Sequence, residues 1–358
     1  MVSTSSPAKY VQIITNDNSG CSFVRLRWNA LYLQQFTSTN IFPVVVPNAI
    51  FDNNYLILTR CIIMQRPVDD RKMEQFYNLK TLQPKYGYKL VAEFDDMVWD
   101  SIPEYNGSSA HMNIQKNCEN MKKICAWADE IMVSTEYMKK SIEKKFDTYN
   151  VTVVENAIPK YLWQNHRKPI SEKIVKPKIL YTGAAQHYMN PLPISQQFPT
   201  GIPGIKGDWT DKWIDFIIDN VKNDRIEFVC MTSLPFFFEE IKEKIQIIPW
   251  TDCNTFPMTV QKQNPDFIIA PLIDNEFNRC KSNLKLLESA AIGAVFIGDK
   301  FENGPYSNII TDIENFWSYT EPNKYNSIID WQDIYMQQHG GYIESEKHLN
   351  KLISIMEK

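Results

Sequence analysis

Residues 266–297 read DFIIAPLIDNEFNRCKSNLKLLESAAIGAVFI. The apolar run over 266–270 is typical of a buried strand, and a second short apolar run covers 294–297. Between them, residues 282–291 have the pattern of a helix that Gly293 ends. A strand, a helix and a second strand in this order indicate a βαβ unit with parallel strands.

The same alternation extends through the rest of the chain. Further strands are expected at 10–15, 41–46, 55–64, 89–94, 130–133 and 151–154 in the first half, and at 179–182, 227–231 and 246–249 in the second. Helices are expected at 23–35, 114–128, 138–146, 212–221, 326–338 and 344–356. Two sets of βαβ units predict an α/β protein with two Rossmann-like domains, each built on a largely parallel sheet.

A length of 358 residues also favours two domains, because single hydrophobic cores rarely grow beyond about 200 residues. We expect an N-terminal domain over 1–160 and a C-terminal domain over 179–325. The proline-punctuated, basic stretch between them, 161–178, is interpreted as a linker. The last residues, 326–358, are expected to form helices that pack back across the domains.

Bulk composition excludes several classes of protein. A hydrophobic fraction of 44% rules out a disordered chain, and a net charge of −4 counts against an obligate nucleic-acid binder. The seven cysteines form no CxxC pair, so neither a metal site nor a disulfide framework is expected. With no signal peptide and no long apolar run, we expect a soluble protein of the cytoplasm, without membrane contact.

Ligands of open parallel sheets bind beyond the carboxyl ends of the strands, which directs attention to the helix over 282–291. Lys281, Lys285 and Glu288 share one face at its start, where unpaired N–H groups and the helix dipole favour a diphosphate. The two lysines would add positive charge, and Glu288 could accept hydrogen bonds from ribose hydroxyls. The alternative is a solvated helix face that carries an ordinary ion pair.

The motif EFNRCKSNLKLLE at 276–288, followed by AAIG, resembles the donor-binding segment of glycosyltransferases with the GT-B fold, above all the glycogen-synthase-like group. The resemblance implies two Rossmann-like domains that face a cleft. It also implies that Lys281, Ser282 and Lys285 hold the diphosphate of a sugar nucleotide and that Glu288 holds its ribose. The Glu-x7-Glu signature of the group is incomplete, since Cys280 occupies its first position. Glu276 or Asn278 is expected to replace this glutamate and to bind the hydroxyls of the sugar ring.

Two further positions agree with this resemblance. KILYTG at 178–183 is similar to the first strand of the family's C-terminal domain, where Gly183 lets the backbone approach the phosphates. Trp250 follows a strand near the expected nucleobase site and could stack on the base. The plainer alternatives are an ordinary turn at Gly183 and a packing role for Trp250.

The N-terminal half resembles the acceptor domain of bacteriophage-encoded glycosyltransferases. Two strings carry this resemblance, SGCSFVRLR at 19–27 and EFDDMVWDSIPEY at 93–105. Asp95 and Asp96 follow a strand and are predicted to be catalytic, because one of two adjacent carboxylates can serve in proton transfer. The alternatives are a turn cap or ion pairs with nearby arginines. The predicted acceptor-side residues are Gly20, Arg25, Arg27 and Trp99.

The expected reaction is sugar transfer from a nucleoside-diphosphate sugar, most simply a UDP-sugar, by a monomer that requires no metal or other cofactor. The resemblance to phage enzymes makes hydroxymethylated cytosine in double-stranded DNA the first acceptor to consider, with Trp99 or the loop 184–207 helping to flip the base. Basic residues that could follow its backbone are Lys139, Lys140, Lys144, Lys145, Lys160, Arg167, Lys168, Lys173, Lys176 and Lys178. The open alternatives are a polysaccharide or protein acceptor, an epimerase, and a non-catalytic binding module.

Overall fold

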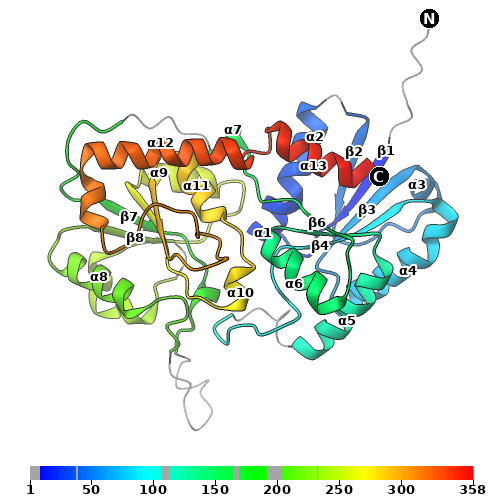
Figure 1. Cartoon of the computed structure of the whole chain (residues 1–358), viewed down its shortest axis with the longest axis horizontal. Coiled ribbons are helices and arrows are strands. Elements are labelled where there is room, and N and C mark those ends of the chain that lie inside the picture. The colour runs from blue at the N-terminus through cyan, green and yellow to red at the C-terminus, as the bar shows by residue number, and fades with distance from the viewer. Residues whose placement is uncertain are drawn as a thin grey trace, which may run out of the picture.

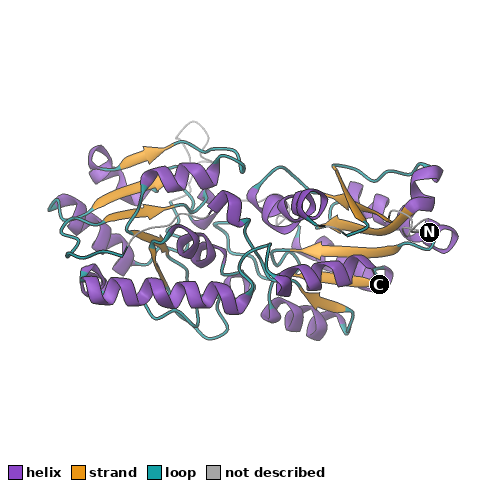
Figure 2. Ribbon diagram, turned by 90° about the horizontal axis from the view of Figure 1, so that it is seen from above, coloured by secondary structure: helices purple, strands orange, loops and turns teal. Residues whose placement is uncertain are grey.

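The computed structural model describes residues 9–37, 39–106, 113–163, 169–191, 204–231 and 233–357. These residues form two lobes, each built around its own sheet (Figure 1). The view from above shows the two sheets separated by loops in the middle of the molecule (Figure 2). No helix among the described residues is long and apolar enough to cross a bilayer.

The N-terminal lobe contains a six-stranded sheet with the order β2-β1-β3-β4-β5-β6. Its strands are β1 Lys9–Ile14, β2 Ile41–Val46, β3 Thr59–Gln65, β4 Lys89–Phe94, β5 Glu130–Val133 and β6 Val151–Val153. All neighbours pair in parallel. Because β2 and β3 lie on opposite sides of β1, the chain changes direction between β1 and β3, and such switch points are common binding sites.

Helices cover both faces of this sheet. They are α1 Gly20–Ser22, α2 Trp28–Phe36, α3 Asn53–Leu58, α4 Asp70–Tyr86, α5 Ile114–Trp127 and α6 Glu136–Phe146, and a π-helical turn, Phe23–Arg27, precedes α2. Phe76 of α4, Ile124 of α5 and Ile142 of α6 are fully buried in the core on one face. Leu33 of α2 lies in the core on the other.

The C-terminal lobe contains a five-stranded parallel sheet with the order β11-β10-β7-β8-β9. Its strands are β7 Lys178–Tyr181, β8 Glu227–Met231, β9 Gln246–Ile248, β10 Phe267–Ala270 and β11 Val295–Gly298. The helices are α7 Lys160–Trp163, α8 Asp211–Lys222, α9 Phe256–Gln263, α10 Glu276–Arg279 and α11 Leu284–Ile292, with 3-10 turns at Ala185–His187, Phe236–Lys244 and Phe316–Thr320. Helix α11 is almost entirely buried.

The two last helices divide between the lobes. Helix α12, Pro322–His339, packs against the C-terminal sheet, where Tyr325 and Ile328 join its core. Helix α13, Glu346–Glu357, returns to the N-terminal lobe, where Leu352 and Ile355 join the core that β1 and β3 share with α2 (Figure 1). The end of the chain therefore ties the two lobes together.

In the first half, one predicted strand was partly wrong and one helix was not predicted. The expected strand over 55–64 begins as helix α3, because the Asp52 carboxylate accepts from the N–H groups of Asn54 and Tyr55, and only then continues as β3. Helix α4 was not predicted at all. Its signals were a capping Asp69, which accepts from the N–H of Lys72, and buried apolar residues at three-residue spacing on an otherwise polar surface.

Candidate functional site

The loops that follow the strands of the two sheets meet between the lobes. Thr135, which follows β5, donates its hydroxyl to the carbonyl of Cys280 at 3.1 Å. Asn156, which follows β6, donates its amide to Ser282 Oγ at 2.6 Å. We refer to residues 275–282 as the bridging segment. The contacting loops follow the carboxyl ends of parallel strands, and this is where ligands of α/β proteins bind.

The bridging segment also buries apolar side chains in the opposite lobe. Phe277 and Cys280 are 1% and 0% exposed and belong to the N-terminal core. Cys280 therefore serves packing at the position where the related signature carries a glutamate. Glu276, one expected substitute for that glutamate, accepts a hydrogen bond from the Tyr137 hydroxyl at 2.8 Å.

The predicted diphosphate residues surround the start of α11. Lys281 Nζ lies 4.7 Å from the centre of the Phe277 ring and 4.0 Å from Asp96 Oδ1 of the other lobe. Ser282 Oγ accepts from Asn156, and Asn283, the residue before α11, does not cap the helix with its side chain. The Leu286 amide already donates to the Asn283 carbonyl at 2.9 Å, so the first-turn amides that an anion next to the Lys281 ammonium can reach are those of Leu284 and Lys285.

Lys285 and Glu288 form an ion pair, but not on a solvated face. Lys285 Nζ lies 2.8 Å from Glu288 Oε2, and Glu288 is only 5% exposed. Burial raises the pKa of Glu288, and Lys285 offsets this only in part. A buried carboxylate next to an uncapped helix start suits hydrogen bonding to ligand hydroxyls better than an ordinary surface ion pair does.

Trp250 offers an exposed aromatic surface beside this helix. Its side chain is 57% exposed, and its ring stacks on Phe256 with centroids 6.5 Å apart and planes 26° from parallel. Lys285 Nζ lies 5.3 Å from the centre of the same Phe256 ring. Trp250 is therefore placed to stack on a flat ligand group that reaches beyond α11.

The structure gives Gly183 and Asn278 roles other than those expected. A Cβ at Gly183 would lie 2.1 Å from the Tyr181 hydroxyl, so packing within the lobe already requires glycine there. Asn278 is fully buried, and its amide donates to Asp208 Oδ1 at 2.7 Å and to the Ile273 carbonyl at 2.9 Å. The expectation that Asn278 grips a sugar is wrong, because its buried side chain cannot reach one.

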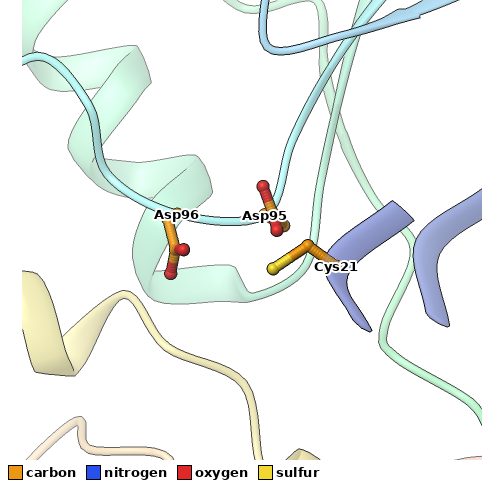
Figure 3. Close-up of side chains that lie close together, drawn as sticks. All are labelled: Cys21, Asp95 and Asp96. Carbon is orange, nitrogen blue, oxygen red and sulfur yellow. The ribbon is translucent and has the colours of Figure 1, made fainter. Parts of the chain in front are cut away.

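Asp95 and Asp96 lie on the loop after β4, and the Cys21 thiol of α1 points toward this loop (Figure 3). The Cys21 sulfur and one oxygen of each carboxylate all lie within 4.8 Å of one another. Asp95 is mostly buried, and Arg66 Nε lies 3.1 Å from its Oδ1. Asp96 is the more accessible of the two, at 22% exposure, and faces Lys281. Asp95 thus pairs with Arg66 rather than with Arg25 or Arg27.

This cluster suits a metal ion poorly. Burial raises the pKa of Cys21 well above its usual value, and the negative charge of Asp95 raises it further, so the thiol stays protonated. A metal prefers a thiolate, and the guanidinium of Arg66 beside Asp95 would repel a second cation. The more accessible carboxylate of this corner is that of Asp96.

Two predicted acceptor-side residues lie in the protein interior. Arg25 is 3% exposed; its Nε lies 2.6 Å from Glu93 Oε1, and its Nη1 donates to Asn156 Oδ1 at 2.9 Å. Trp99 is fully buried and packs edge-on against Phe94. Neither residue can contact an acceptor, so both predictions were wrong; Arg25 instead orients Asn156 toward the bridging segment.

The other two acceptor-side residues lie nearer the surface. Arg27 Nη2 donates to Thr15 Oγ1 at 2.8 Å and to Asn18 Oδ1 at 2.7 Å, which fixes the loop after β1. A Cβ at Gly20 would meet no atom within 4 Å, so Gly20 borders open space. Both residues belong to the segment that follows β1, at the carboxyl ends of the strands of the N-terminal sheet.

Two cavities adjoin these loops. The first, of about 190 Å³, lies between the lobes; its polar lining comprises Thr135, Glu136, Tyr137, Lys140, Arg279, Lys281, Asn303 and Ser307. The second, of about 200 Å³, lies at the switch point between β1 and β3 and is lined by Asn16, Arg66, Val68, Asp69, Asp70, Asn113, Lys116 and Asn117. Its lining includes amide and charged side chains, and Arg66 links it to Asp95.

The sequence did not predict a buried hydrogen-bond network centred on Asp208, which we call the Asp208 hub. This fully buried carboxylate accepts from the Tyr105 hydroxyl of the other lobe at 2.9 Å and contacts His187 Nδ1 at 2.7 Å, in addition to Asn278. Burial alone would raise the pKa of Asp208, but the hydrogen bond and charge of His187, with Lys281 and Tyr105, lower it. No spacing in the sequence links these residues, and His187 taken alone had no visible partner.

Comparison with solved structures shows which proteins share this architecture. The catalytic domain of starch synthase IV from Arabidopsis thaliana, bound to ADP and acarbose, aligns over 99% of this chain and 96% of its own, with 9% identity and a TM-score of 0.51. A glycosyltransferase from Rickettsia africae aligns over 98% and 95%, with 14% identity and a TM-score of 0.49. TarM from S. aureus aligns over 83% of this chain at 12% identity and a TM-score of 0.49.

The chain spans only 55% of the length of TarM. The sequence matches no protein-family model and no curated protein. At such low identity the structural match shows the fold alone. The chain has the GT-B fold, with two α/β lobes whose parallel sheets face each other across a cleft.

Proposed function

We propose that the protein is a glycosyltransferase that moves a sugar from a nucleoside-diphosphate donor to a hydroxyl group. The observation that carries this proposal is the approach of Lys281 Nζ to within 4.0 Å of Asp96 Oδ1 across the cleft. A cation at the start of a buried helix suits a diphosphate, and a carboxylate on the opposite loop suits an acceptor hydroxyl. The GT-B fold supports the same reaction class.

On the donor side, the diphosphate would bind the first-turn amides of α11 together with Lys281 and Ser282. Glu288, buried beside Lys285, would accept from the ribose hydroxyls, and exposed Trp250 would stack on the base. The starch synthase of matching fold was solved with ADP. UDP-sugars and ADP-sugars are therefore the donors to test first.

The reaction follows from these positions. An acceptor hydroxyl would give its proton to Asp96 as its oxygen bonds to the anomeric carbon of the sugar, while the bond from that carbon to the diphosphate breaks. The leaving electrons stay on the diphosphate oxygen, where Lys281 and the α11 amides stabilise the charge. Asp95, held by Arg66 at 3.1 Å, would keep the loop and Asp96 in place.

The acceptor is best proposed as a carbohydrate. The cavity at the β1–β3 switch point is lined mainly by polar and charged residues, includes Arg66, which contacts Asp95, and has a volume of about 200 Å³, enough for a sugar ring. This observation favours an oligosaccharide or polysaccharide over the other acceptors.

Hydroxymethylated cytosine in DNA is a weaker candidate, because many of the lysines expected to follow its backbone are already paired with carboxylates. The pairs are Lys139–Glu143, Lys145–Asp100, Lys173–Glu321, Lys176–Asp224 and Lys178–Glu227. Arg167, Lys168 and residues 192–203, half of the loop 184–207 that was expected to assist base flipping, lie outside the described residues. Trp99, the other predicted helper, is buried.

A donor and acceptor screen tests the proposal. The purified protein is mixed with UDP-, ADP- and GDP-sugars, alone, with oligosaccharide mixtures, or with hydroxymethylated duplex DNA, and both nucleotide release and acceptor mass are followed. Gain of one sugar on an oligosaccharide is the expected result. Gain of one sugar on the DNA would support the glycosyltransferase activity but would identify DNA, and not a carbohydrate, as the acceptor. Donor binding without any turnover would identify a binding module, and a change in the donor sugar without transfer would identify an epimerase.

A further inference from the structure

His187 has the geometry of a positioned proton donor. Its Nδ1 lies 2.7 Å from Asp208 Oδ2, and the Asp208 side chain is 1% exposed. The other carboxylate oxygen, Oδ1, accepts from Tyr105 OH, from the Asn278 amide and, at 3.3 Å, from the N–H of Ile273. A carboxylate held by four donors is rigid, and it fixes the orientation of the imidazole that it contacts.

His187 lies on the donor side of the cleft. It ends the 3-10 turn Ala185–His187 that follows β7 and Gly183, at the carboxyl edge of the C-terminal sheet. Its partner Asp208 contacts Asn278 in the bridging segment, three residues before Lys281. Lys281 is also close enough for its charge to contribute to the lowered pKa of Asp208. His187 and the start of α11 therefore border the same region.

The second imidazole nitrogen is available for a ligand. The side chain of His187 is 26% exposed, and within the described part of the chain its Nε2 has no hydrogen-bond partner. When a buried carboxylate holds Nδ1–H, Nε2 becomes the atom that exchanges protons with a substrate, as in histidine–carboxylate pairs of hydrolases. The charged and titratable groups that act on its partner Asp208 are His187 itself, Lys281 and Tyr105.

The donor site needs such a group. Lys285 is paired with Glu288 at 2.8 Å, and Lys281 lies 4.0 Å from Asp96, so both lysines near the start of α11 already face a carboxylate. The leaving diphosphate gains a full negative charge when the sugar departs. A second positive group that also carries a proton would stabilise this charge at the oxygen where it develops.

We propose that His187 Nε2 contacts the terminal phosphate of the donor and protonates the leaving oxygen, an inference that rests on the proposed glycosyltransferase function. The bond between the anomeric carbon and that oxygen breaks, and the oxygen keeps the electron pair and takes the Nε2 proton. The acceptor oxygen forms the new bond to the sugar and gives its own proton to Asp96. Solvent then returns a proton to His187 and removes one from Asp96, so atoms and charge balance.

Two substitutions separate this role from a structural one. In His187→Asn, the amide nitrogen replaces Nδ1 and keeps the bond to Asp208, while Nε2 is lost. In His187→Gln, the amide nitrogen lies near the position of Nε2, so it can donate to a phosphate but cannot transfer a proton. His339→Asn is the matched control, because His339 stacks on Tyr335 at the end of α12 and does not contact Asp208.

The first readout is independent of turnover: the ratio of affinities for UDP and UMP, or for ADP and AMP if the protein prefers adenine. We expect His187→Asn to lower this ratio about tenfold, the effect of one charge-assisted hydrogen bond, and His339→Asn to leave it unchanged. His187→Gln should retain most of the ratio. With a sugar-nucleotide donor, both His187 variants should lose about 100-fold in kcat.

An unchanged diphosphate-to-monophosphate ratio in both His187 variants, with wild-type kcat, would overturn the assignment while leaving the glycosyltransferase proposal intact. A fall in kcat without any change in the ratio for His187→Asn would also overturn the phosphate contact. If the wild-type protein binds no nucleoside diphosphate, the proposed function itself fails. Thermal unfolding of each variant checks that the Asp208 hub is preserved.

Discussion

Lys281 Nζ lies 4.0 Å from Asp96 Oδ1, and the two residues belong to opposite lobes. The side chain of Lys281 is 23% exposed and that of Asp96 is 22% exposed. At partial exposure such a pair contributes little to stability, and we propose that it marks the positions of a donor-side cation and an acceptor-side carboxylate. The following predictions test that interpretation.

Lys281→Ala should weaken the binding of a nucleoside-diphosphate sugar by about 10- to 100-fold, because it removes a charge-assisted contact to the diphosphate. Isothermal titration with UDP and ADP measures the effect. Lys262→Ala is the matched control, since Lys262 is an exposed lysine of α9. Equal affinities for the wild type and Lys281→Ala would remove Lys281 from the donor site.

Asp96→Asn should lower kcat by at least about 100-fold and leave donor affinity within threefold of the wild type, because the amide keeps the shape but cannot take a proton. Asp100→Asn, a change at an exposed aspartate paired with Lys145, should have no such effect. Initial rates and donor titration together give the answer. Unaltered kcat in Asp96→Asn would assign the acceptor proton to another base.

Trp250→Ala should weaken nucleotide binding by about tenfold, the size of one base–aromatic stack, and leave the sugar and phosphate contacts in place. The loss should therefore be the same for UDP and UMP. Because Trp250 is 57% exposed, its removal should hardly change the melting temperature. Ile247→Ala, at another exposed position on the preceding strand, serves as the control. If Trp250→Ala leaves the nucleotide affinity unchanged, Trp250 packs on Phe256 and does not stack on the base.

Arg25→Ala should reduce the free energy of unfolding by about 3–5 kcal/mol, because it leaves the fully buried Glu93 carboxylate without its cation. Burial raises the pKa of Glu93 to about 7 even with Arg25 present. Urea unfolding measures the loss. The exposed pair Lys173–Glu321 provides the contrast, since Lys173→Ala should cost less than about 1 kcal/mol. Similar costs for both variants would argue against a structural role for Arg25.

His348 should make stability depend on pH. Burial, followed by the charge of Arg25, lowers its pKa from 6.5 to about 4, so the unfolded chain binds a proton in this range that the native protein does not. Above pH 6.5 neutral His348 does not reduce the stability of the protein. As the pH falls from 6.5 toward 4, the free energy of unfolding decreases by about 3 kcal/mol in total. His348→Gln, which can keep the bond to Asn29, should remove this part of the pH dependence. Identical pH profiles of the two proteins in urea unfolding would contradict the assignment.

Much of the architecture follows from local patterns in the sequence. Strands such as 89–94 and 130–133 were predicted at their observed bounds, because an apolar run between turn residues has few other ways to be buried. The helix expected over 282–291 is observed as α11, Leu284–Ile292, so Lys285 and Glu288 lie on it while Lys281 precedes it, contrary to the expected shared face. The structure adds that Glu288 is buried, a fact that spacing alone does not reveal.

The parts that the sequence did not predict depend on contacts between distant segments. Arg25 reads as a surface cation until Glu93, 68 residues away, is brought beside it. The sequence predicted that Trp99 lies in the cleft, but in the structure Trp99 is packed edge-on against Phe94. Asp208 meets Tyr105 across 103 residues, and only the arrangement of the lobes brings the two together. Periodicity carries no information about such pairs.

A structure of the protein with UDP or ADP bound tests the proposed donor site most directly. We predict that the phosphates lie at the first turn of α11, within hydrogen-bond distance of Lys281 Nζ and Ser282, with the base against Trp250. A nucleotide whose phosphates lie elsewhere, or the absence of binding by either nucleotide at millimolar concentration, would contradict the proposed donor site.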